Sequence, residues 1–263
     1  LGAVAHLSSI EGRVPFLHFF DGFRTSHELQ KIEVWDYDDL KEMVNMDAVE
    51  AFRKRALLPE SPTLHGSAQN PDTYFQAREA CNPYYEAFPD VVEKYMNMVN
   101  AKIGTDYKPF NYIGAPDAER VIIAMGSVCE TIDETIEYLV SKGEKVGAIK
   151  VRLYRPFSAK HLLSVMPKTV KTINVIDRTK EAGSAGEPLY LDVVAALSKS
   201  EFAGVKILNG RYGLAGKNTT PMDIIAILNN EDKYDFTVGI VDDLTHKSLE
   251  RGEHVDTAPA GTT

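Results

Sequence analysis

Two loops hold most of the residues that could do chemistry. The first, FRTSHE, comes after the apolar run Arg13 to Phe20 and the turn signal Asp21–Gly22. In an α/β fold, ligands usually meet the loop that leaves the carboxyl end of a strand. Thr25 with Glu28 also fits a helix capping box, so a ligand contact and a structural role are both open. The candidates of this loop are Arg24, Thr25, Ser26 and His27.

The second loop, DRTKEAGSAGEP, lies between an expected strand and an expected helix. Its basic residues and glycines suit contact with a phosphate-bearing ligand, contact with another subunit, or a plain loop. It lacks the GxGxxG pattern, so a dinucleotide fingerprint is not supported. The candidates of this loop are Asp177, Arg178, Lys180, Gly183, Gly186 and Glu187.

Two further loops have weaker signals. Met125 to Ser127 presents backbone N–H groups that could hold an anion, or Ser127 could simply cap the next helix. NGRYGLAGKNTTP resembles a phosphate-binding loop, but Arg211 stands where that motif needs Gly, and Asn218 stands where it needs Ser or Thr. Neither loop identifies a nucleotide site; Thr219 and Thr220 before Pro221 instead predict a helix cap with Pro at the first helical position.

The sequence gives no metal ligands and no catalytic residue. A zinc helix starting at His27 would need its second histidine where Lys31 stands. Asp242 and Asp243 could bind a cation or could be a solvated strand end. The chain has two cysteines, Cys81 and Cys129, which are too widely spaced for a CxxC site; Cys129 fits a buried small residue better than a reactive thiol.

The elements that position these loops are strand–turn–helix units. ERVIIAMGSVCET combines a β-branched run, Gly126 for a tight turn and a helix start at Ser127. The pattern recurs three times before about Asn230, and a last strand is expected at Phe236 to Asp243. Strands alternating with helices predict a mostly parallel sheet covered on both faces. Pro109 weakens the strand Tyr107 to Ile113, which is therefore expected at a sheet edge.

The first hundred residues read differently. Arg13 to Phe20 is expected to be a buried strand and Lys31 to Trp35 an edge strand. The unpatterned stretch Leu58 to Asp72 is a linker or a functional loop. Asn70 and Pro71 should open a helix, Pro83 should interrupt it, and Asp90 to Ala101 should form another.

Composition places the chain among soluble globular proteins. With 263 residues and 44% hydrophobic content it can build a real core, and its longest apolar runs are too short to span a bilayer. The net charge of −9 argues against a nucleic-acid or anionic-membrane partner. We expect a cytoplasmic protein. The chain begins at Leu1 inside an apparent helix, which suggests a piece of a longer polypeptide.

Several strings resemble one family, the single-chain pyruvate:ferredoxin (or flavodoxin) oxidoreductases. The resemblance covers Leu1 to about Leu249. It implies a three-layer α/β/α domain with a five-stranded, mostly parallel sheet, like the carboxyl-terminal domain of transketolase, with one antiparallel edge strand and preceded by the tail of another α/β domain. The matching strings are FLHFFDGFRTSHE, AQNPDTYFQAREA, ERVIIAMGSVCET, VRLYRPFS, DRTKEAGSAGEPLYLDV and RYGLAGKNTTP.

The resemblance also implies the chemistry of a parent enzyme. That enzyme would oxidatively decarboxylate pyruvate to acetyl-CoA and CO2, using thiamine diphosphate, Mg²⁺, 4Fe-4S clusters and coenzyme A, and would pass electrons to ferredoxin or flavodoxin. The diphosphate–magnesium motif, the cluster cysteines and the family's YPITPSS-like substrate segment are absent from this sequence, and two cysteines cannot ligate a four-iron cluster. We therefore expect no cofactor on this chain alone and no activity from it alone.

The resemblance divides the chain into four parts. Residues 1–58 would end the thiamine pyrimidine-binding domain, 59–104 would be a linker with connecting helices, 105–245 the transketolase-like domain, and 246–263 a mobile tail. The preferred role is a non-catalytic packing and dimerisation domain; the alternative is a ligand-binding module for part of coenzyme A or the 2-oxoacid. The expected partners are the remaining domains of the parent chain, a second copy in a homodimer, and ferredoxin or flavodoxin.

Overall fold

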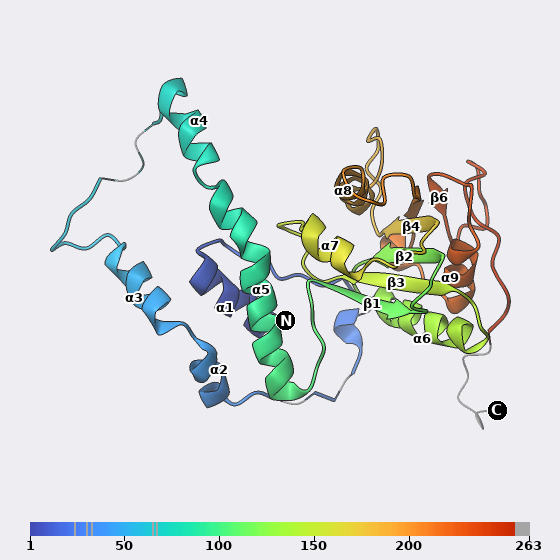
Figure 1. Cartoon of the computed structure of the whole chain (residues 1–263), viewed down its shortest axis with the longest axis horizontal. Coiled ribbons are helices and arrows are strands. Elements are labelled where there is room, and N and C mark those ends of the chain that lie inside the picture. The colour runs from blue at the N-terminus through green and yellow to red at the C-terminus, as the bar shows by residue number, and fades with distance from the viewer. Residues whose placement is uncertain (24, 30, 33, 65, 67, 256–263) are drawn as a thin grey trace. The chain divides into compact units, whose positions relative to one another are not determined.

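The computed structural model describes residues 1–255 apart from positions 24, 30, 33, 65 and 67 (Figure 1). The chain forms two compact units. Unit 1 comprises Leu1–Phe19 and Gln30–Pro109, and unit 2 comprises Phe20–Leu29 and Phe110–Thr263. Among the helices of the described residues, none has both the length and the apolar character needed to cross a bilayer.

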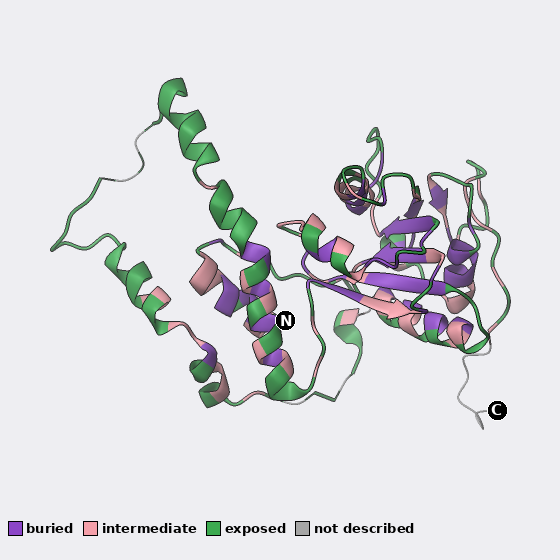
Figure 2. Ribbon diagram, in the orientation of Figure 1, coloured by how far each residue is buried: buried purple, intermediate pink, exposed green. Residues whose placement is uncertain are grey.

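Unit 1 is helical, and its core lies where α1 packs against α5. The predicted helix Asp90 to Ala101 lies inside α5, and Pro83 occupies its first turn, where a proline is tolerated. Buried residues concentrate on α1 and α5, whereas α3 and α4 bury none (Figure 2). The helices are α1 (Gly2–Gly12), α2 (Tyr37–Met43), α3 (Met46–Lys54), α4 (Pro71–Glu79) and α5 (Asn82–Ile103).

Both strands predicted in the amino-terminal part are wrong where the structure describes them. Arg13 to Phe20 is irregular, and most of its residues are exposed although Val14 is buried. Residues 31, 32, 34 and 35 are also irregular, and position 33 lies outside the described residues. A strand exists only when a neighbour completes its hydrogen-bond ladder, and no described residue pairs with either segment.

Unit 2 is built on one six-stranded sheet with the order β1-β3-β2-β4-β5-β6. β1 lies at the edge of the sheet, as Pro109 predicted. It pairs antiparallel with β3, and the other pairings are parallel. The resemblance implied five strands; the sixth, β6, is the start of the strand predicted over Phe236 to Asp243 and pairs with β5 over two residues. The strands are β1 (Phe110–Gly114), β2 (Arg120–Ala124), β3 (Val146–Val151), β4 (Thr172–Asp177), β5 (Lys206–Arg211) and β6 (Phe236–Thr237).

Two apolar clusters flank this sheet, and alternate residues of β2 contribute to each. Ile122 belongs to the cluster that includes α6 and α9, whereas Ile123 belongs to the cluster that includes α8 and Leu162 of α7. Successive side chains of a strand point to opposite faces, so these helices cover different faces of the sheet. The helices are α6 (Val128–Ser141), α7 (Ala159–Val165), α8 (Pro188–Leu197) and α9 (Pro221–Leu228).

The helix starts of unit 2 agree with the sequence at one position and differ at another. Thr220 and Asp223 form a full capping box before Pro221 of α9. Ser127 precedes α6 but makes no side-chain cap, so the expected serine cap is wrong; its hydroxyl donates to another part of the chain. Gly126 makes the predicted turn, with φ of 88°.

The carboxyl-terminal segment is less regular than its sequence predicted. Of the strand expected over Phe236 to Asp243, only β6 forms. The backbone of Ser248 nevertheless bridges Thr237 in parallel, and the Gly252 N–H donates to the Met222 carbonyl at 3.0 Å. Residues 246–255 thus contact unit 2, while 256–263 lie outside the described residues.

Candidate functional site

A carboxylate lies at the carboxyl edge of the sheet in unit 2, between the ends of β2 and β4. Asp21 Oδ1 accepts the Ser127 N–H at 3.1 Å, and Asp21 Oδ2 accepts the Ser127 hydroxyl. The guanidinium of Arg178, directly after β4, donates to the same Oδ2 and to the Gly213 carbonyl, the latter at 2.9 Å. Three segments distant in sequence therefore converge on one side chain.

This position is the topological switch point of the sheet. β2 is followed by α6, which lies on one face, and β4 by α8, which lies on the other. Ligands of doubly wound domains bind in the crevice that such a divergence opens. The N-terminus of α6 adds the Ser127 N–H and a dipole that favours an anion there.

The electrostatics of Asp21 follow from its neighbours. Burial alone would raise its pKa, but the two hydrogen bonds from Ser127 and the charge of Arg178 outweigh burial, so the pKa lies below its ordinary value. The Asp21 side chain is 20% exposed and that of Arg178 is 29% exposed. Two glycines allow the close approach: a Cβ on Gly126 would meet Asp21 Oδ1 at 3.3 Å, and one on Gly213 would meet Arg178 Nε at 3.3 Å.

The FRTSHE loop folds back on itself directly after Asp21. Thr25–His27 is a single 3₁₀ turn (η1), and the Ser26 N–H donates to the Gly22 carbonyl at 3.1 Å. The Ser26 hydroxyl and His27 Nδ1 both contact the Phe23 carbonyl, at 2.9 and 2.7 Å. Ser26 and His27 are exposed, Thr25 is half-buried, and Arg24 lies outside the described residues.

Asp177 is a buried acid at the end of β4. Its carboxylate accepts the Leu189 and Tyr190 N–H groups, at 3.1 and 3.2 Å, and so caps α8 from the preceding strand. Burial raises its pKa to about 6 against the lowering effect of these two hydrogen bonds, and the nearby Glu187 charge adds to the increase. The Asp177 side chain therefore has a structural role as the cap of α8, and it has little access to solvent.

Glu187 organises the rest of the second loop. It is 1% exposed, its Oε1 lies 3.1 Å from Arg211 and 3.8 Å from Lys180, and its Oε2 accepts the Glu181 N–H at 2.8 Å. Glu187, Arg211 and Lys180 line a polar hollow of about 220 Å³. Its lining also includes Ser184, Gly186, Asn209, Asp235, Thr245 and Lys247.

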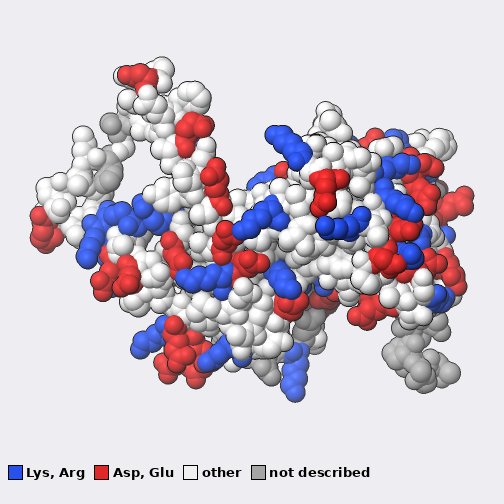
Figure 3. All heavy atoms as spheres, in the orientation of Figure 1, with Lys and Arg blue, Asp and Glu red and all other residues white. Residues whose placement is uncertain are grey.

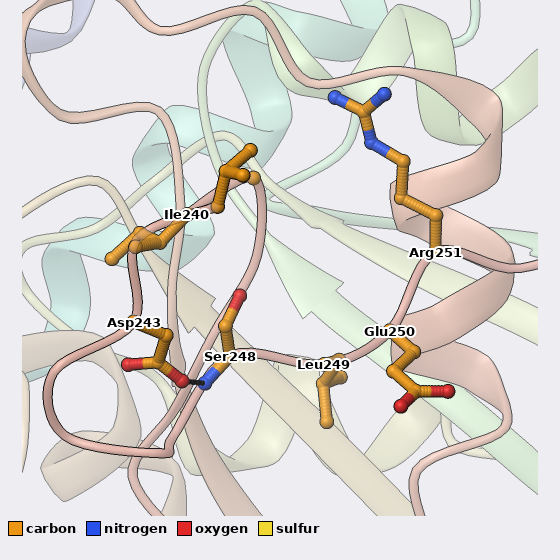
Figure 4. Close-up of a pocket in the computed structure, with 8 residues that line it drawn as sticks. Ile240, Asp243, Ser248, Leu249, Glu250 and Arg251 are labelled. Carbon is orange, nitrogen blue, oxygen red and sulfur yellow. Dashed lines mark hydrogen bonds between the residues drawn. The ribbon is translucent and has the colours of Figure 1, made fainter.

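A second hollow, of about 360 Å³, lies among the carboxyl-terminal loops (Figure 4). Ile240 and Leu249 contribute apolar wall, and Glu250 and Arg251 contribute charge. Asp243 accepts the Ser248 N–H at 2.6 Å and two hydrogen bonds from Thr245. Its oxygens thus fix a turn, which favours the structural interpretation of the acidic pair.

The other sequence-based candidates fall in ordinary surroundings. Cys129 packs partly buried against the α6–α9 cluster, and burial raises its pKa to about 12, so it is a thiol at neutral pH. Gly183 is an exposed turn residue with φ of 87°. A Cβ on Gly186 would clash with the Tyr190 ring at 2.5 Å, which explains glycine there.

The structure joins the two predicted loops through Asp21 and Arg178 and gathers Lys180, Gly186 and Glu187 around one hollow. Sequence reasoning treated Asp21 only as part of a turn and did not consider Asn209, Asp235 or Lys247. Asp21 offered one local signal, its place directly after the predicted strand Arg13 to Phe20, whereas Asn209 lies inside β5 and Asp235 directly precedes β6. The face drawn in Figure 3 shows basic and acidic side chains intermixed, in keeping with the acidic net charge.

Comparison with known families gives two adjacent matches. Residues 1–97 match the family described as "Pyruvate flavodoxin/ferredoxin oxidoreductase, thiamine diP-bdg". Residues 118–224 match "Pyruvate:ferredoxin oxidoreductase core domain II". The first match includes the Asp21 segment, which the structure nevertheless groups with unit 2.

Curated relatives match over the full chain. The pyruvate:ferredoxin oxidoreductase of Moorella thermoacetica is 57% identical over 100% of this chain and 23% of that protein. The pyruvate-flavodoxin oxidoreductase of Enterobacter agglomerans is 56% identical over 100% of the chain and 23% of its own length. The probable Escherichia coli enzyme of that name is 48% identical over 95% and 22%. The chain thus spans less than a quarter of these relatives.

A solved structure, the 2-oxoglutarate:ferredoxin oxidoreductase from Magnetococcus marinus with 2-oxoglutarate, coenzyme A and succinyl-CoA bound, aligns over 62% of this chain and 25% of that one. Its TM-score is 0.37 and its identity 17%. The two successive family matches, and identities of 57% and 56% to relatives that align with the full chain, carry the assignment instead. The chain belongs to the pyruvate:ferredoxin/flavodoxin oxidoreductase family.

Proposed function

We propose that this chain is a non-catalytic packing part of a thiamine-dependent oxidoreductase that converts pyruvate to acetyl-CoA and CO2. The observation that carries the proposal is the pair of successive family matches on a chain that spans 23% of its relatives. The remaining domains of the parent would supply thiamine diphosphate, Mg²⁺ and 4Fe-4S sites, and ferredoxin or flavodoxin would accept the electrons. A homodimer in the cytoplasm and a three-layer, transketolase-like second domain complete this proposal.

The surface of unit 1 supports a packing role. Several large apolar side chains of unit 1 are exposed to solvent: Leu17 is 81% exposed, Val34 88% and Leu64 92%. Unit 1 exposes many further large apolar side chains, which supports contact with other protein. Its cover in the parent enzyme would be further domains or a second copy.

The groups that could hold a cofactor in unit 2 are already paired within the chain. Arg178 and the N-terminus of α6 contact Asp21, and Lys180 and Arg211 face Glu187. These groups of unit 2 are therefore engaged within the chain rather than held open for a diphosphate. This arrangement supports our assignment of the cofactor sites to the rest of the parent.

The direct test uses the whole polypeptide that contains this chain. We expect pyruvate- and coenzyme A-dependent reduction of a one-electron acceptor by the whole protein and none by residues 1–263. Pyruvate-independent reduction, or no reduction by a fully loaded protein, would refute the function. Calorimetric titration of the chain with thiamine diphosphate plus Mg²⁺ should give no heat of binding.

The polar hollow beside Glu187 favours a second candidate, a module that binds part of coenzyme A. Lys180 and Lys247 line it together with Asn209, so it offers cations and amide donors to a phosphate. Heat on titration with coenzyme A that disappears in Lys180→Ala would support this candidate. If Lys180→Ala and Arg178→Ala leave the Michaelis constant for coenzyme A unchanged in the whole enzyme, the candidate fails.

A further inference from the structure

The switch-point crevice of unit 2 is filled by the chain's own carboxylate. Asp21 takes the N–H and hydroxyl of Ser127 and the guanidinium of Arg178, the kinds of donor with which such crevices hold an anionic ligand. Arg178 is fixed from its other side by the Gly213 carbonyl, at 2.9 Å. The donors converge on Asp21 with no other acidic side chain among their hydrogen-bond partners in the described part of the chain.

The segment that carries Asp21 belongs to a different family match from the crevice that receives it. Phe20–Leu29 lies within the match to residues 1–97 but forms part of unit 2, whereas Ser127 and Arg178 lie within the match to residues 118–224. The segment beyond Asp21 has few anchors of its own. Its hydrogen bonds among the described residues are local, to Gly22, to Phe23 and between Ser26 and His27, and the last two residues are exposed.

We propose that Asp21 is a positioning residue. The crevice serves as a socket for its carboxylate, and this anchor fixes the position of the Thr25–His27 turn, in which Ser26 and His27 are exposed. For its catalytic consequence the inference rests on the proposed parent enzyme, in which this turn would stand beside the 2-oxoacid or its cofactor while other domains supply the catalytic groups. The crevice is accordingly unavailable to an external anion while Asp21 occupies it.

The electrostatic design fits this role. A carboxylate that accepts charge-assisted hydrogen bonds at a helix N-terminus is held more strongly than a neutral side chain in the same place. Asp21→Asn preserves the shape but removes the charge, and Ser127→Ala removes the hydroxyl donor while leaving the N–H. Asp36→Asn is the matched control, because Asp36 also accepts a backbone N–H, from Asp38 at 3.0 Å, but in unit 1.

The first experiment measures hydrogen–deuterium exchange on the chain itself. Asp21→Asn is expected to speed exchange at the Ser127 amide and across residues 22–29 by about tenfold or more, since a charge-assisted hydrogen bond is lost. Asp36→Asn should leave both regions unchanged. Unchanged exchange in Asp21→Asn would overturn the socket, whatever the enzyme proves to do.

The second experiment measures pyruvate oxidation by the whole polypeptide. Displacement of a positioned group by about 1 Å lowers turnover by up to a hundredfold, so Asp21→Asn is expected to lower kcat at least tenfold while Asp36→Asn does not. Faster exchange with an unchanged kcat and Michaelis constant would overturn the positioning role. If the unmodified protein oxidises no pyruvate, the proposed function fails, and the exchange result alone still decides the socket.

Discussion

The buried ion pair between Glu187 and Arg211 gives the sharpest prediction about stability. Glu187 is 1% exposed and the Arg211 side chain 13%, with 3.1 Å between Oε1 and the guanidinium. At that distance the attraction is about 5 kcal/mol for an effective dielectric constant of about 20. Removing one partner of a buried pair costs about 3–5 kcal/mol because the other charge stays buried.

Glu187→Gln should fall at the lower end of that range. Arg211 keeps its contact with the Asp235 carbonyl at 2.8 Å, and the new amide oxygen can still accept the Glu181 N–H. We expect a loss of about 3 kcal/mol in the free energy of unfolding. With a urea dependence of about 2–3 kcal/mol per molar, the midpoint should fall by roughly 1 M.

The assay is urea unfolding followed by far-UV circular dichroism. The single tryptophan, Trp35, lies in unit 1, so its fluorescence should stay unchanged while the circular dichroism transition of unit 2 moves. Glu119→Gln is the control, because Glu119 pairs with Lys171 at 2.6 Å but the side chains are 36% and 69% exposed. Such exposed pairs contribute about 1 kcal/mol or less.

A Glu187→Gln midpoint no lower than that of Glu119→Gln would refute the reasoning. The double variant Glu187→Gln/Arg211→Met supplies an internal check. Since it removes both charges, it should be less destabilised than the sum of the single variants, by about 1–3 kcal/mol. Additive losses would show that the two side chains do not act as a pair.

Three further predictions use other described groups. Burial raises the pKa of Asp177 to about 6, so the folded protein binds this proton more tightly than the unfolded chain does. The resulting contribution to stability is present below about pH 4 and is lost as the pH rises toward 6. Asp177→Asn should flatten that part of the stability–pH curve measured by urea unfolding, and an unchanged curve would contradict this prediction. Glu11 accepts the Tyr95 hydroxyl at 2.6 Å and lies 2.7 Å from Lys94 Nζ. Glu11→Gln should therefore lower the free energy of unfolding of unit 1, followed by Trp35 fluorescence, by about 1–2 kcal/mol, and an unchanged unfolding midpoint would count against that network. Cys129, with its pKa raised to about 12, should be the slower thiol to alkylate at neutral pH, which mass mapping against Cys81→Ser can check; fast labelling would mean that its surroundings open.

The sequence predicted those elements whose signals are local. The β-branched run of β2, the glycine turn at Gly126 and the Thr220 cap each depend on a few neighbouring residues, and the structure has them. Pro109 likewise predicted the edge position of β1, whereas its antiparallel direction came only from the family resemblance. Arg13 to Phe20 failed because its apolar character says nothing about whether a neighbouring strand completes the ladder.

The site was harder to predict than the sheet. Candidate loops were found by their place after strands, but the contact of Asp21 with Arg178 joins residues 157 positions apart. No spacing rule links them, and Asp–Gly reads as a turn in any sequence. Likewise Asp235 joins the hollow through a hydrogen bond from Asn209 at 3.0 Å, a pairing that exists only once β5 and β6 are adjacent.

The cap that Asp177 provides has a consequence for how this domain can vary. Because the acid at the end of β4 holds the first N–H groups of α8 directly, strand and helix are clamped together without help from the residues between them. Residues 179–186 form a loop between these two elements, and Asp177 already joins the elements at the ends of the loop. Insertions or deletions within that loop should leave the register of the sheet intact, so this loop is a place where related enzymes can change their surface at little cost in stability.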